Sequence, residues 1–384
     1  MKRLFIIGLL ISVFIMVACA PKTAPITGAP PALLPTPSQV TPSAAPISNL
    51  PPPTSQDASW AKVVEAAKKE GELTIYAYAF TSDTGVALSK AFKDKYGIKL
   101  NIVTGRGAEQ TERVKTEQRI KQVVADIMEG APTHLNQMKQ AGFTVSLLDI
   151  PVLKEKDVWV LDPLSTDPQG HLVLDFPAHY PPAINTNLIK PADEPKSYMD
   201  LLDPKWKDKI MDNDPNISTS PYMTYVPLTK YKVLSEDYFR KLGEQNLQFV
   251  RGETEKAEKL SRGEFPVAFM GSESTFPAFA AEGAPIKAIA MREGTPVSGN
   301  AMIAIKNSPH PNAAKLFINW IISTEGSPLL AKVKGQMSLR KGVPDYRPPT
   351  YAVKPVKLIP ITDEDWEMMT TLFNDKYLVK LWKK

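Results

Sequence analysis

Apolar and polar positions alternate in blocks that predict a regular succession of helices and strands after residue 57. Apolar residues recur at helical spacing from Trp60 to Ala67, and Gly71 follows them as a helix stop. Residues 73–78 then form a run rich in β-branched and aromatic side chains, which predicts a strand. The first structured segment is therefore expected to be a helix followed by a strand.

The same patterns continue to the end of the chain. They predict helices at 86–96, 105–120, 221–228, 239–247, 311–323 and 363–381, strands at 98–103, 123–127, 210–211, 266–270 and 301–305, and a helix or turn at 200–207. This alternation predicts an α/β fold of mainly parallel sheets flanked by helices, in which loops at the strand C-terminal ends form a crevice. Residues 58–384 exceed one typical hydrophobic core, so two lobes are expected.

The first 19 residues have the pattern of a bacterial lipoprotein signal. Lys2 and Arg3 precede an apolar run from Leu4 to Val17, which is shorter than the roughly 20 residues that a membrane-spanning helix needs. Small residues then precede Cys19, the only cysteine of the chain. We expect residues 1–18 to be removed and Cys19 to carry a lipid that anchors the protein to the outer face of the cell membrane.

Residues 20–56 differ in composition from everything that follows. They contain eleven prolines, one charge and no aromatic residue, so they cannot bury enough apolar surface to fold. Proline-rich chains favour an extended conformation of about 3.1 Å per residue, which gives this segment a reach on the order of 100 Å. We expect residues 19–57 to form a disordered tether between the anchor and the folded part.

Composition excludes several classes of function. One cysteine permits no intrachain disulfide, and a formal charge of +5 without a dense basic run argues against nucleic-acid binding. The four histidines show no metal-binding spacing, and no Gly-x-Ser-x-Gly motif is present. We therefore expect no catalytic residues, no resident metal and no cofactor.

Several sequence stretches together carry a resemblance to a known family. They are residues 60–71, 91–98, 105–107 with 125–126, 185–188, 195–207, 263–267, 307–320 and 323–326. In their order and spacing the chain resembles the solute-binding proteins of ABC importers, family 1, of the type related to ferric-ion-binding proteins. The resemblance implies a two-lobed, periplasmic-binding-protein-like type II fold with the ligand cleft between the lobes.

The resemblance also implies the division of the chain and its partners. We expect residues 58–158 with 272–325 to form lobe one, and 159–271 with 326–384 to form lobe two. A small-molecule ligand would bind between the lobes, and the permease subunits in the membrane would receive it from a monomeric receptor. The same fold would also serve a surface receptor that senses a ligand without importing it.

Ferric relatives hold their metal with two adjacent tyrosines, a histidine and a glutamate. Alignment with that pattern places Glu273 and Ser274 at the tyrosine pair, Thr81 at the histidine and Asp83 at the glutamate. Three of the four ligands are therefore absent, and bare ferric ion is disfavoured. Asp83 and Glu273 either form an acidic pair that faces a cation or amine, or are solvated loop charges.

Hydroxyl groups at predicted helix N-termini point instead to an anion. Ser218, Thr219 and Ser220 lie at the N-terminus of one such helix, Ser82 and Thr84 precede the helix at 86–96, and Ser298 and Asn300 lie on a further loop. Ordinary helix capping explains any one of them, but their recurrence on loops that the family fold directs into the cleft favours binding.

Three further residues complete the expected site. Arg106 is either an ionic partner of the ligand or a surface residue, and Asp126 belongs to a stretch that carries the family resemblance. Tyr222, with Tyr225 and Phe276, forms either a flat cleft wall or part of the core. The predicted cargo is a small polar solute, with anionic groups, or a chelated metal.

Overall fold

The computed structural model describes residues 55–80 and 82–382. The chain divides into two units, Met1–Pro52 and Pro53–Lys384, and the description below concerns the second. Cys19, Thr81 and the predicted signal segment lie outside the described residues. The first helix begins at Ser55, slightly before the expected end of the tether.

Helices and strands alternate as the sequence predicts. The α-helices are α1 (Ser55–Glu70), α2 (Ser82–Tyr96), α3 (Gly107–Ile120), α4 (Pro132–Gln140), α5 (Tyr222–Lys230), α6 (Glu236–Glu244), α7 (Glu253–Arg262), α8 (Phe276–Ala281), α9 (Pro311–Ile321), α10 (Gly326–Lys334), α11 (Asp363–Asn374) and α12 (Tyr377–Trp382). The strands are β1 (Glu72–Ala77), β2 (Lys99–Thr104), β3 (Ile127–Gly130), β4 (Thr144–Val145), β5 (Val173–His179), β6 (Ala183–Asn185), β7 (Ile210–Asn213), β8 (Gln248–Val250), β9 (Val267–Ala268), β10 (Ile286–Ala288), β11 (Thr295–Ile305) and β12 (Leu358–Pro360). Short 3₁₀ helices lie at Pro151–Lys154, Pro191–Asp193, Tyr198–Leu202 and Pro204–Trp206.

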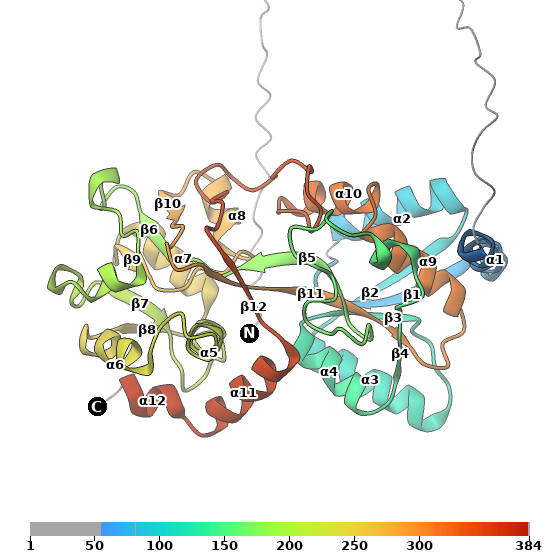
Figure 1. Cartoon of the computed structure of the whole chain (residues 1–384), viewed down its shortest axis with the longest axis horizontal. Coiled ribbons are helices and arrows are strands. Elements are labelled where there is room, and N and C mark those ends of the chain that lie inside the picture. Colours follow the sequence, from blue (N-terminus) through green and yellow to red (C-terminus); the bar gives the residue numbers. More distant parts are fainter. Residues whose placement is uncertain (1–54, 81, 383–384) are drawn as a thin grey trace, which may run out of the picture. The chain divides into compact units, whose positions relative to one another are not determined.

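The strands form two sheets, each with its own flanking helices (Figure 1). The first sheet has the order β12-β11-β3-β1-β2, and β4 and β5 also pair with β11. The second has the order β10-β6-β9-β7-β8. This arrangement confirms the α/β fold with two lobes that the alternating pattern predicts.

Two long antiparallel strands connect the lobes. β5 pairs with β11 from Val173↔Met302 to His179↔Val297, and the chain then continues from β5 into β6 of the second sheet. β11 brings the chain back from β10 of the second sheet to β3 of the first. A later segment, residues 335–357, joins α10 to β12. These connections place the hinge beside β5 and β11.

The sheets are mixed rather than mainly parallel. β1 is parallel to β2 and β3, as expected, but β11 is antiparallel to β3 and β5. In the second sheet β6 is antiparallel to β9 and β10. The difference arises because the connecting strands enter each sheet from the opposite lobe, which local periodicity does not reveal.

Two element boundaries differ from the prediction. The strand expected at 123–127 is β3, which starts only at Ile127; just before it, the side chain of Asp126 accepts the backbone N–H groups of Thr74 and His310. The single helix expected at 363–381 is divided into α11 and α12, since Lys376 adopts a left-handed φ of 53° between them.

Sheet membership also differs from the expected division of the lobes. The expected lobe one includes residues 272–325, yet β10 lies in the second sheet and α8 packs on α7 and β10. Conversely, the expected lobe two includes α10, which packs on α2 and α9 of the first lobe. The chain therefore crosses between the lobes near β11 and again after α10, later than the sequence suggests.

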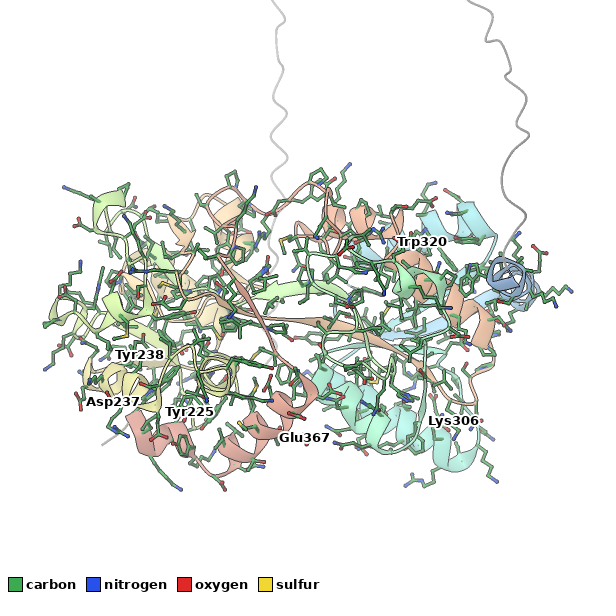
Figure 2. The ribbon with its side chains drawn as sticks, in the orientation of Figure 1. Tyr225, Asp237, Tyr238, Lys306, Trp320 and Glu367 are labelled. Atoms are coloured by element: carbon green, nitrogen blue, oxygen red, sulfur yellow. The ribbon has the colours of Figure 1, made fainter. Side chains whose placement is uncertain are left out.

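Each lobe has its own apolar core. In the first core Phe92 meets Phe317 edge to face and Trp320 at a tilt, and in the second Tyr198 meets Tyr238 edge to face and Phe269 at a tilt. Figure 2 labels Trp320 in one lobe and Tyr238 in the other. No helix among the described residues is long and apolar enough to span a membrane.

Helix α11 bridges the two lobes opposite the crossing strands. Its Trp366 and Met369 pack in the second core, while Asp363 accepts hydrogen bonds from Asn136 (3.1 Å) and Lys139 (3.2 Å) of α4 in the first lobe. Glu367, labelled in Figure 2, accepts another from Gln140 at 2.9 Å. The present arrangement of the lobes is thus held by polar contacts on this side.

Candidate functional site

Loops from both sheets surround a cleft of about 670 Å³. The lining residues are Tyr78, Ala79, Thr84, Ala131, Pro132, Thr133, Phe176, Ala178, Tyr180, Thr219, Met223, Ser272, Ser274, Ser298, Gly299, Asn300, Val333, Lys334, Gln336 and Trp366. This volume is in the range of sites for small molecules, roughly 300–1,000 Å³. The cleft is therefore the candidate ligand site.

The position of the cleft follows from the direction of the strands. Tyr78 and Ala131 directly follow the carboxyl ends of β1 and β3, and Ser272 follows β9 of the second sheet. Open α/β sheets bind ligands outside these ends, where successive loops diverge. The crevice that the alternating pattern predicts is thus present, with walls from both lobes.

Three helices also direct their N-terminal turns toward the cleft. Thr84 lies in the first turn of α2, Pro132 begins α4, and Thr219 precedes α5. The first backbone N–H groups of a helix lack intrahelical partners and carry partial positive charge. The cleft is consequently suited to oxygen-rich groups, and above all to negatively charged ones.

A fully buried carboxylate lies beneath this lining. Oε2 of Glu129 accepts the backbone N–H groups of Tyr78 (2.9 Å) and Ala79 (2.8 Å), and Oε1 accepts Nδ2 of Asn300 at 2.7 Å. Burial raises the pKa of Glu129, although these donors oppose the rise. Because the amide of Asn300 is oriented by Glu129, its own oxygen is left to accept a hydrogen bond from elsewhere.

A second carboxyl group, Asp175 on β5, is buried nearby. Its Oδ2 has no hydrogen-bond partner among the described residues, and its Oδ1 accepts the backbone N–H of Phe176 at 3.0 Å. Burial, and next the negative charge of Glu129, raise the pKa of Asp175 well above its usual value.

Lys334, the last residue of α10, reaches the cleft from the first lobe. Its Nζ donates to the backbone oxygen of Ala79 at 3.0 Å and lies 4.5 Å from the centre of the Phe176 ring. Burial lowers the pKa of Lys334, while Glu129 and Asp175 oppose the change. No ion pair joins Lys334 to either acid in the described part of the chain.

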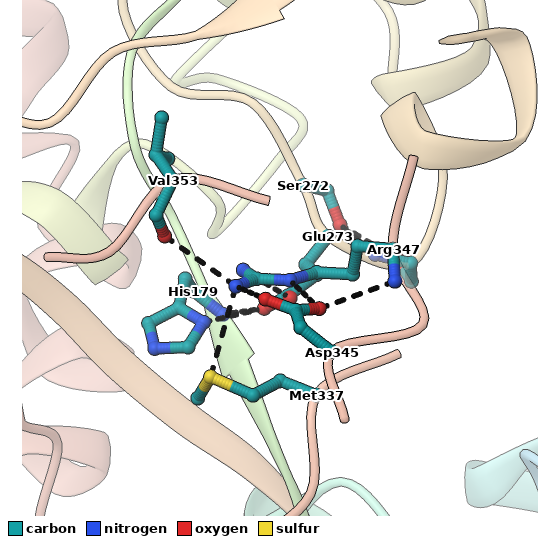
Figure 3. Close-up of polar contacts among 8 residues, drawn as sticks. His179, Ser272, Glu273, Met337, Asp345, Arg347 and Val353 are labelled. Carbon is teal, nitrogen blue, oxygen red and sulfur yellow. Dashed lines mark hydrogen bonds and ion pairs between the residues drawn. The ribbon is translucent and has the colours of Figure 1, made fainter. Parts of the chain in front are cut away.

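Behind the cleft, Glu273 belongs to a network of buried charges (Figure 3). Its Oε1 accepts from Arg347, and its Oε2 accepts from the backbone N–H of His179 (2.5 Å) and lies 2.7 Å from His179 Nδ1. Arg347 also donates to Asp345 on the segment that leads to β12. Burial alone raises the pKa of Glu273, but His179 and Arg347 outweigh it and lower the pKa.

This network explains how the neighbouring serines are placed. Glu273 lies between Ser272 and Ser274, whose hydroxyl groups are 2.7 Å apart at the cleft wall. The backbone N–H of Ser272 also donates to Glu253 of α7. The acidic residue therefore anchors the loop, while the two hydroxyl groups face the cleft.

The structure brings together only part of the site expected from the sequence. Thr219, Ser274, Ser298 and Asn300 all line the cleft. They come from loops or strands of both lobes, as the family resemblance implies.

Three predicted ligand residues are buried in structural positions instead. Asp126 accepts the backbone N–H of Thr74 and contacts His310, and Glu273 lies in the charge network already described. Tyr222 is fully buried, and its hydroxyl accepts the backbone N–H of Leu378 at 3.3 Å. None of the three lines the cleft, because each one satisfies backbone or charged groups inside the protein; for Tyr222 this agrees with the alternative that it belongs to the core.

The remaining predicted residues lie around the cleft but do not line it. Asp83 is exposed in the first turn of α2, and Arg106 is exposed at the N-cap of α3. Ser218 accepts the backbone N–H of Ser220 at 3.2 Å, which is ordinary local capping. The side chain of Ser82 lies outside the description, so its predicted role stays untested.

Sequence reasoning missed several residues of the cleft. Phe176 and Trp366 lie on β5 and α11, and Tyr180 directly follows β5, in segments whose apolar and polar spacing gives no sign of a site. Lys334 has the sequence pattern of a solvated lysine at the end of an amphipathic helix. Only the packing of α10 against the first sheet brings it to the ligand position.

The chemistry of the cleft is that of binding. Within the described ranges, no cluster of three His, Cys, Asp or Glu residues has the geometry of a metal site. Neutral hydroxyl and amide groups predominate, together with aromatic faces and one ammonium group. Such a lining can hold a small polar molecule by hydrogen bonds and flat contacts.

Comparisons with known proteins agree with this description. Residues 87–366 match the sequence model of the family described as bacterial extracellular solute-binding protein. An uncharacterized protein of Haemophilus influenzae is 25% identical over 333 residues, which cover 83% of this chain and 91% of that relative.

Solved structures are similar over nearly their whole length. Iron-bound HitA of Pseudomonas aeruginosa has a TM-score of 0.61 and 22% identity, and covers 79% of this chain and 99% of its own. AfuA of Actinobacillus pleuropneumoniae, with fructose-6-phosphate bound, has a TM-score of 0.54 and 23% identity, covering 81% and 97%. At these identities the likeness establishes the fold alone.

Proposed function

Because the chain belongs to the bacterial extracellular solute-binding proteins, we propose that it is the substrate-binding component of an ABC importer. It captures a small polar solute with anionic groups in the cleft and delivers it to a permease in the membrane. The observation that carries this proposal is the 670 Å³ cleft, because both lobes line it with hydrogen-bonding groups.

Closure of the lobes is the step that the permease would detect. A ligand that contacts Thr219 and Ser274 on one lobe and Lys334 on the other interacts with more groups when the lobes are close. It therefore favours the closed arrangement by its differential affinity for that state. β5, β11 and the segment 335–357 supply the hinge for this motion.

The relatives differ in what they bind, so the cargo must be judged from the cleft itself. HitA was solved with iron bound, and AfuA was solved with fructose-6-phosphate bound. In this chain an ammonium group, Lys334, lies at the cleft, and the buried acids are covered by the lining. These features favour an anionic solute or an anionic metal chelate over a bare metal cation.

Export and anchoring through Cys19 complete the proposal. The predicted signal and tether precede the folded unit, and a lipid on Cys19 would keep the receptor beside its permease. Cys19→Ser should release the protein from the membrane fraction and abolish incorporation of labelled palmitate in cells. Retention of both label and membrane association by that variant would contradict lipidation at this residue.

The proposed function is tested by thermal unfolding of the whole chain against a ligand panel. Organic carboxylates, sugar phosphates, phosphonates, ferric citrate, ferric ion, polyamines and neutral sugars cover the chemistry under consideration. A ligand at about 100 times its dissociation constant stabilises the fold by roughly 2.7 kcal/mol, which shifts the melting temperature by a few degrees.

A shift caused by one class of anionic solute would identify the cargo and support the receptor function. Import is then measured as uptake of that labelled solute by cells with and without the gene. Normal uptake without the gene, together with ligand binding, would favour a ligand-sensing surface receptor. Turnover of the solute by the purified protein would contradict a role limited to binding.

A further inference from the structure

The lining of the cleft contains one charged side chain among the described residues, Lys334. A lysine ammonium has three N–H donors, and one of them donates to the backbone oxygen of Ala79. We propose that Lys334 binds the anionic group of the cargo and so selects solutes that carry a carboxylate or phosphate. This inference rests on the proposed function and assigns its charge selectivity to one residue.

The ammonium is positioned for this task by its surroundings. Nζ lies 4.5 Å from the centre of the Phe176 ring, and the bond to Ala79 fixes it at the end of β1. The aromatic face attracts the cation electrostatically and so limits the positions that the ammonium group can adopt. Gly335 follows in the left-handed conformation with a φ of 60°, so α10 ends at Lys334.

Glu129 and Asp175 lie near Lys334 but do not occupy the position where a ligand anion would pair with its ammonium group. Glu129 already accepts two backbone N–H groups and the amide of Asn300, and no atom pair brings it within ion-pair distance of Lys334 in the described chain. Glu129 and Asp175 are 0% and 1% exposed, respectively. A ligand in the cleft would therefore meet the ammonium but neither carboxylate.

Charge then discriminates between classes of solute. A cationic ligand would face Lys334 with no accessible carboxylate in the cleft lining to compensate it. A neutral ligand would displace water from the ammonium without supplying a counter-charge, which is unfavourable. An anionic oxygen supplies a charge-assisted hydrogen bond and removes that cost.

The neighbouring amide adds a second requirement. Asn300 donates Nδ2 to Glu129, and no hydrogen bond to its Oδ1 is found in the part of the chain that the structure describes. That oxygen can accept a hydroxyl or N–H group of the ligand. The inferred cargo class is thus a small carboxylate or phosphate that also carries a hydrogen-bond donor.

The test uses titration calorimetry on the whole chain in detergent. The probes are glucose 6-phosphate, gluconate and citrate, with glucose as the neutral counterpart of the first two. Lys334→Gln removes the charge, Lys334→Arg retains it, and Lys332→Gln removes an exposed charge from the same helix as a matched control. Melting temperatures verify that each variant is folded.

We expect the unchanged protein to bind at least one anionic probe more tightly than glucose. Lys334→Gln should weaken that binding by about tenfold or more, as loss of a hydrogen bond to a charged group implies. Lys334→Arg should restore most of the affinity, and Lys332→Gln should leave it unchanged.

Two results would overturn the inference while leaving the receptor function intact. One is unchanged affinity of folded Lys334→Gln for the anionic probe, and the other is equal or tighter binding of glucose by the unchanged protein. If Lys334→Gln does not fold, loss of anion binding by folded Lys334→Arg would also count against the inference, because the charge is still present. Failure of the unchanged protein to bind any of the anionic probes would contradict the inference, whereas the proposed function is judged by the wider ligand panel.

Discussion

Nη1 of Arg347 lies 2.8 Å from Oε1 of Glu273, and both side chains are almost completely buried. The pair joins the segment after α10 to the loop after β9, and the same carboxylate receives the backbone N–H of His179 at the end of β5. Three segments that approach the hinge are thus held at one carboxylate (Figure 3). Breaking this pair leaves a charge inside the protein.

We expect Arg347→Met to lower the free energy of unfolding by about 3–5 kcal/mol, because it removes the guanidinium from a fully buried carboxylate and leaves Glu273 only its contacts with His179. Arg262→Met is the control, since Arg262 pairs with Glu258 and Glu264 at the exposed surface and should cost less than about 1 kcal/mol. Urea unfolding at pH 7 measures both. Equal losses in the two variants would contradict a special role for the buried pair.

The same carboxylate makes stability depend on pH. The folded-state pKa of Glu273 is lowered, so its contribution is present above the unfolded value of about 4.3 and is lost as pH falls through the folded pKa. We expect Glu273→Gln to be less stable at pH 7 and to lose less stability on acidification. Denaturant unfolding between pH 7 and pH 3 tests this, and parallel curves for the two proteins would refute it.

Asp175 makes stability depend on pH in the opposite direction from Glu273. Its folded pKa is raised by burial and by Glu129, so stability falls as pH rises from about 3.9 toward that pKa. We expect Asp175→Asn to exceed the unchanged protein in stability by about 1 kcal/mol or more at pH 8, and to match it near pH 4. Exposed Asp193→Asn is the control and should change little at either pH. A less stable Asp175→Asn at pH 8 would contradict the prediction.

Gly299 of β11 lies close to the backbone of Phe176 on β5. A Cβ at this position would be 2.1 Å from the backbone oxygen of Phe176, whereas a Cβ at Gly85 would be no closer than 3.5 Å to its nearest neighbour. We expect Gly299→Ala to destabilise the fold by about 1–3 kcal/mol and to weaken ligand binding, since β11 lines the cleft. Gly85→Ala, inside α2, should be neutral or stabilising. Thermal unfolding that ranks the two variants in the reverse order would show that the strands can separate without cost.

Variants of Thr219 and Ser218 distinguish a residue that binds the ligand from one that caps the local backbone. Thr219 lines the cleft, whereas the Ser218 hydroxyl accepts the backbone N–H of Ser220. We expect Thr219→Val to reduce affinity for the cargo by about threefold to tenfold, the effect of one neutral hydrogen bond, and Ser218→Ala to leave affinity unchanged. Calorimetry with the solute that the ligand panel identifies is the measurement. A larger loss of affinity in Ser218→Ala than in Thr219→Val would show that the ligand-binding hydroxyl belongs to Ser218.

Local pattern in the sequence accounts for most of the described α-helices but for only half of the described strands, and it missed β5 among others. Helical spacing from Trp60 and the β-branched run at 73–78 correspond to α1 and β1, because burying one face of an element requires that periodicity. The crevice at the carboxyl ends of strands was expected from the alternating pattern, whereas Thr219, Ser274, Ser298 and Asn300, which line it, were expected there only through the family resemblance.

Tertiary structure decided what spacing does not encode. The antiparallel pairing of β5 with β11 joins residues more than one hundred positions apart, so neither strand alone reveals the hinge. Lys334 is also more than one hundred positions from Phe176 and Glu129 in the sequence, and a lysine at a helix end has the same local pattern whether it meets water or a ligand. Glu273 and Asp126 show the converse, because their carboxylates satisfy buried N–H groups and charges that come from distant segments. The sequence determined the elements, and packing determined which polar groups face the cleft.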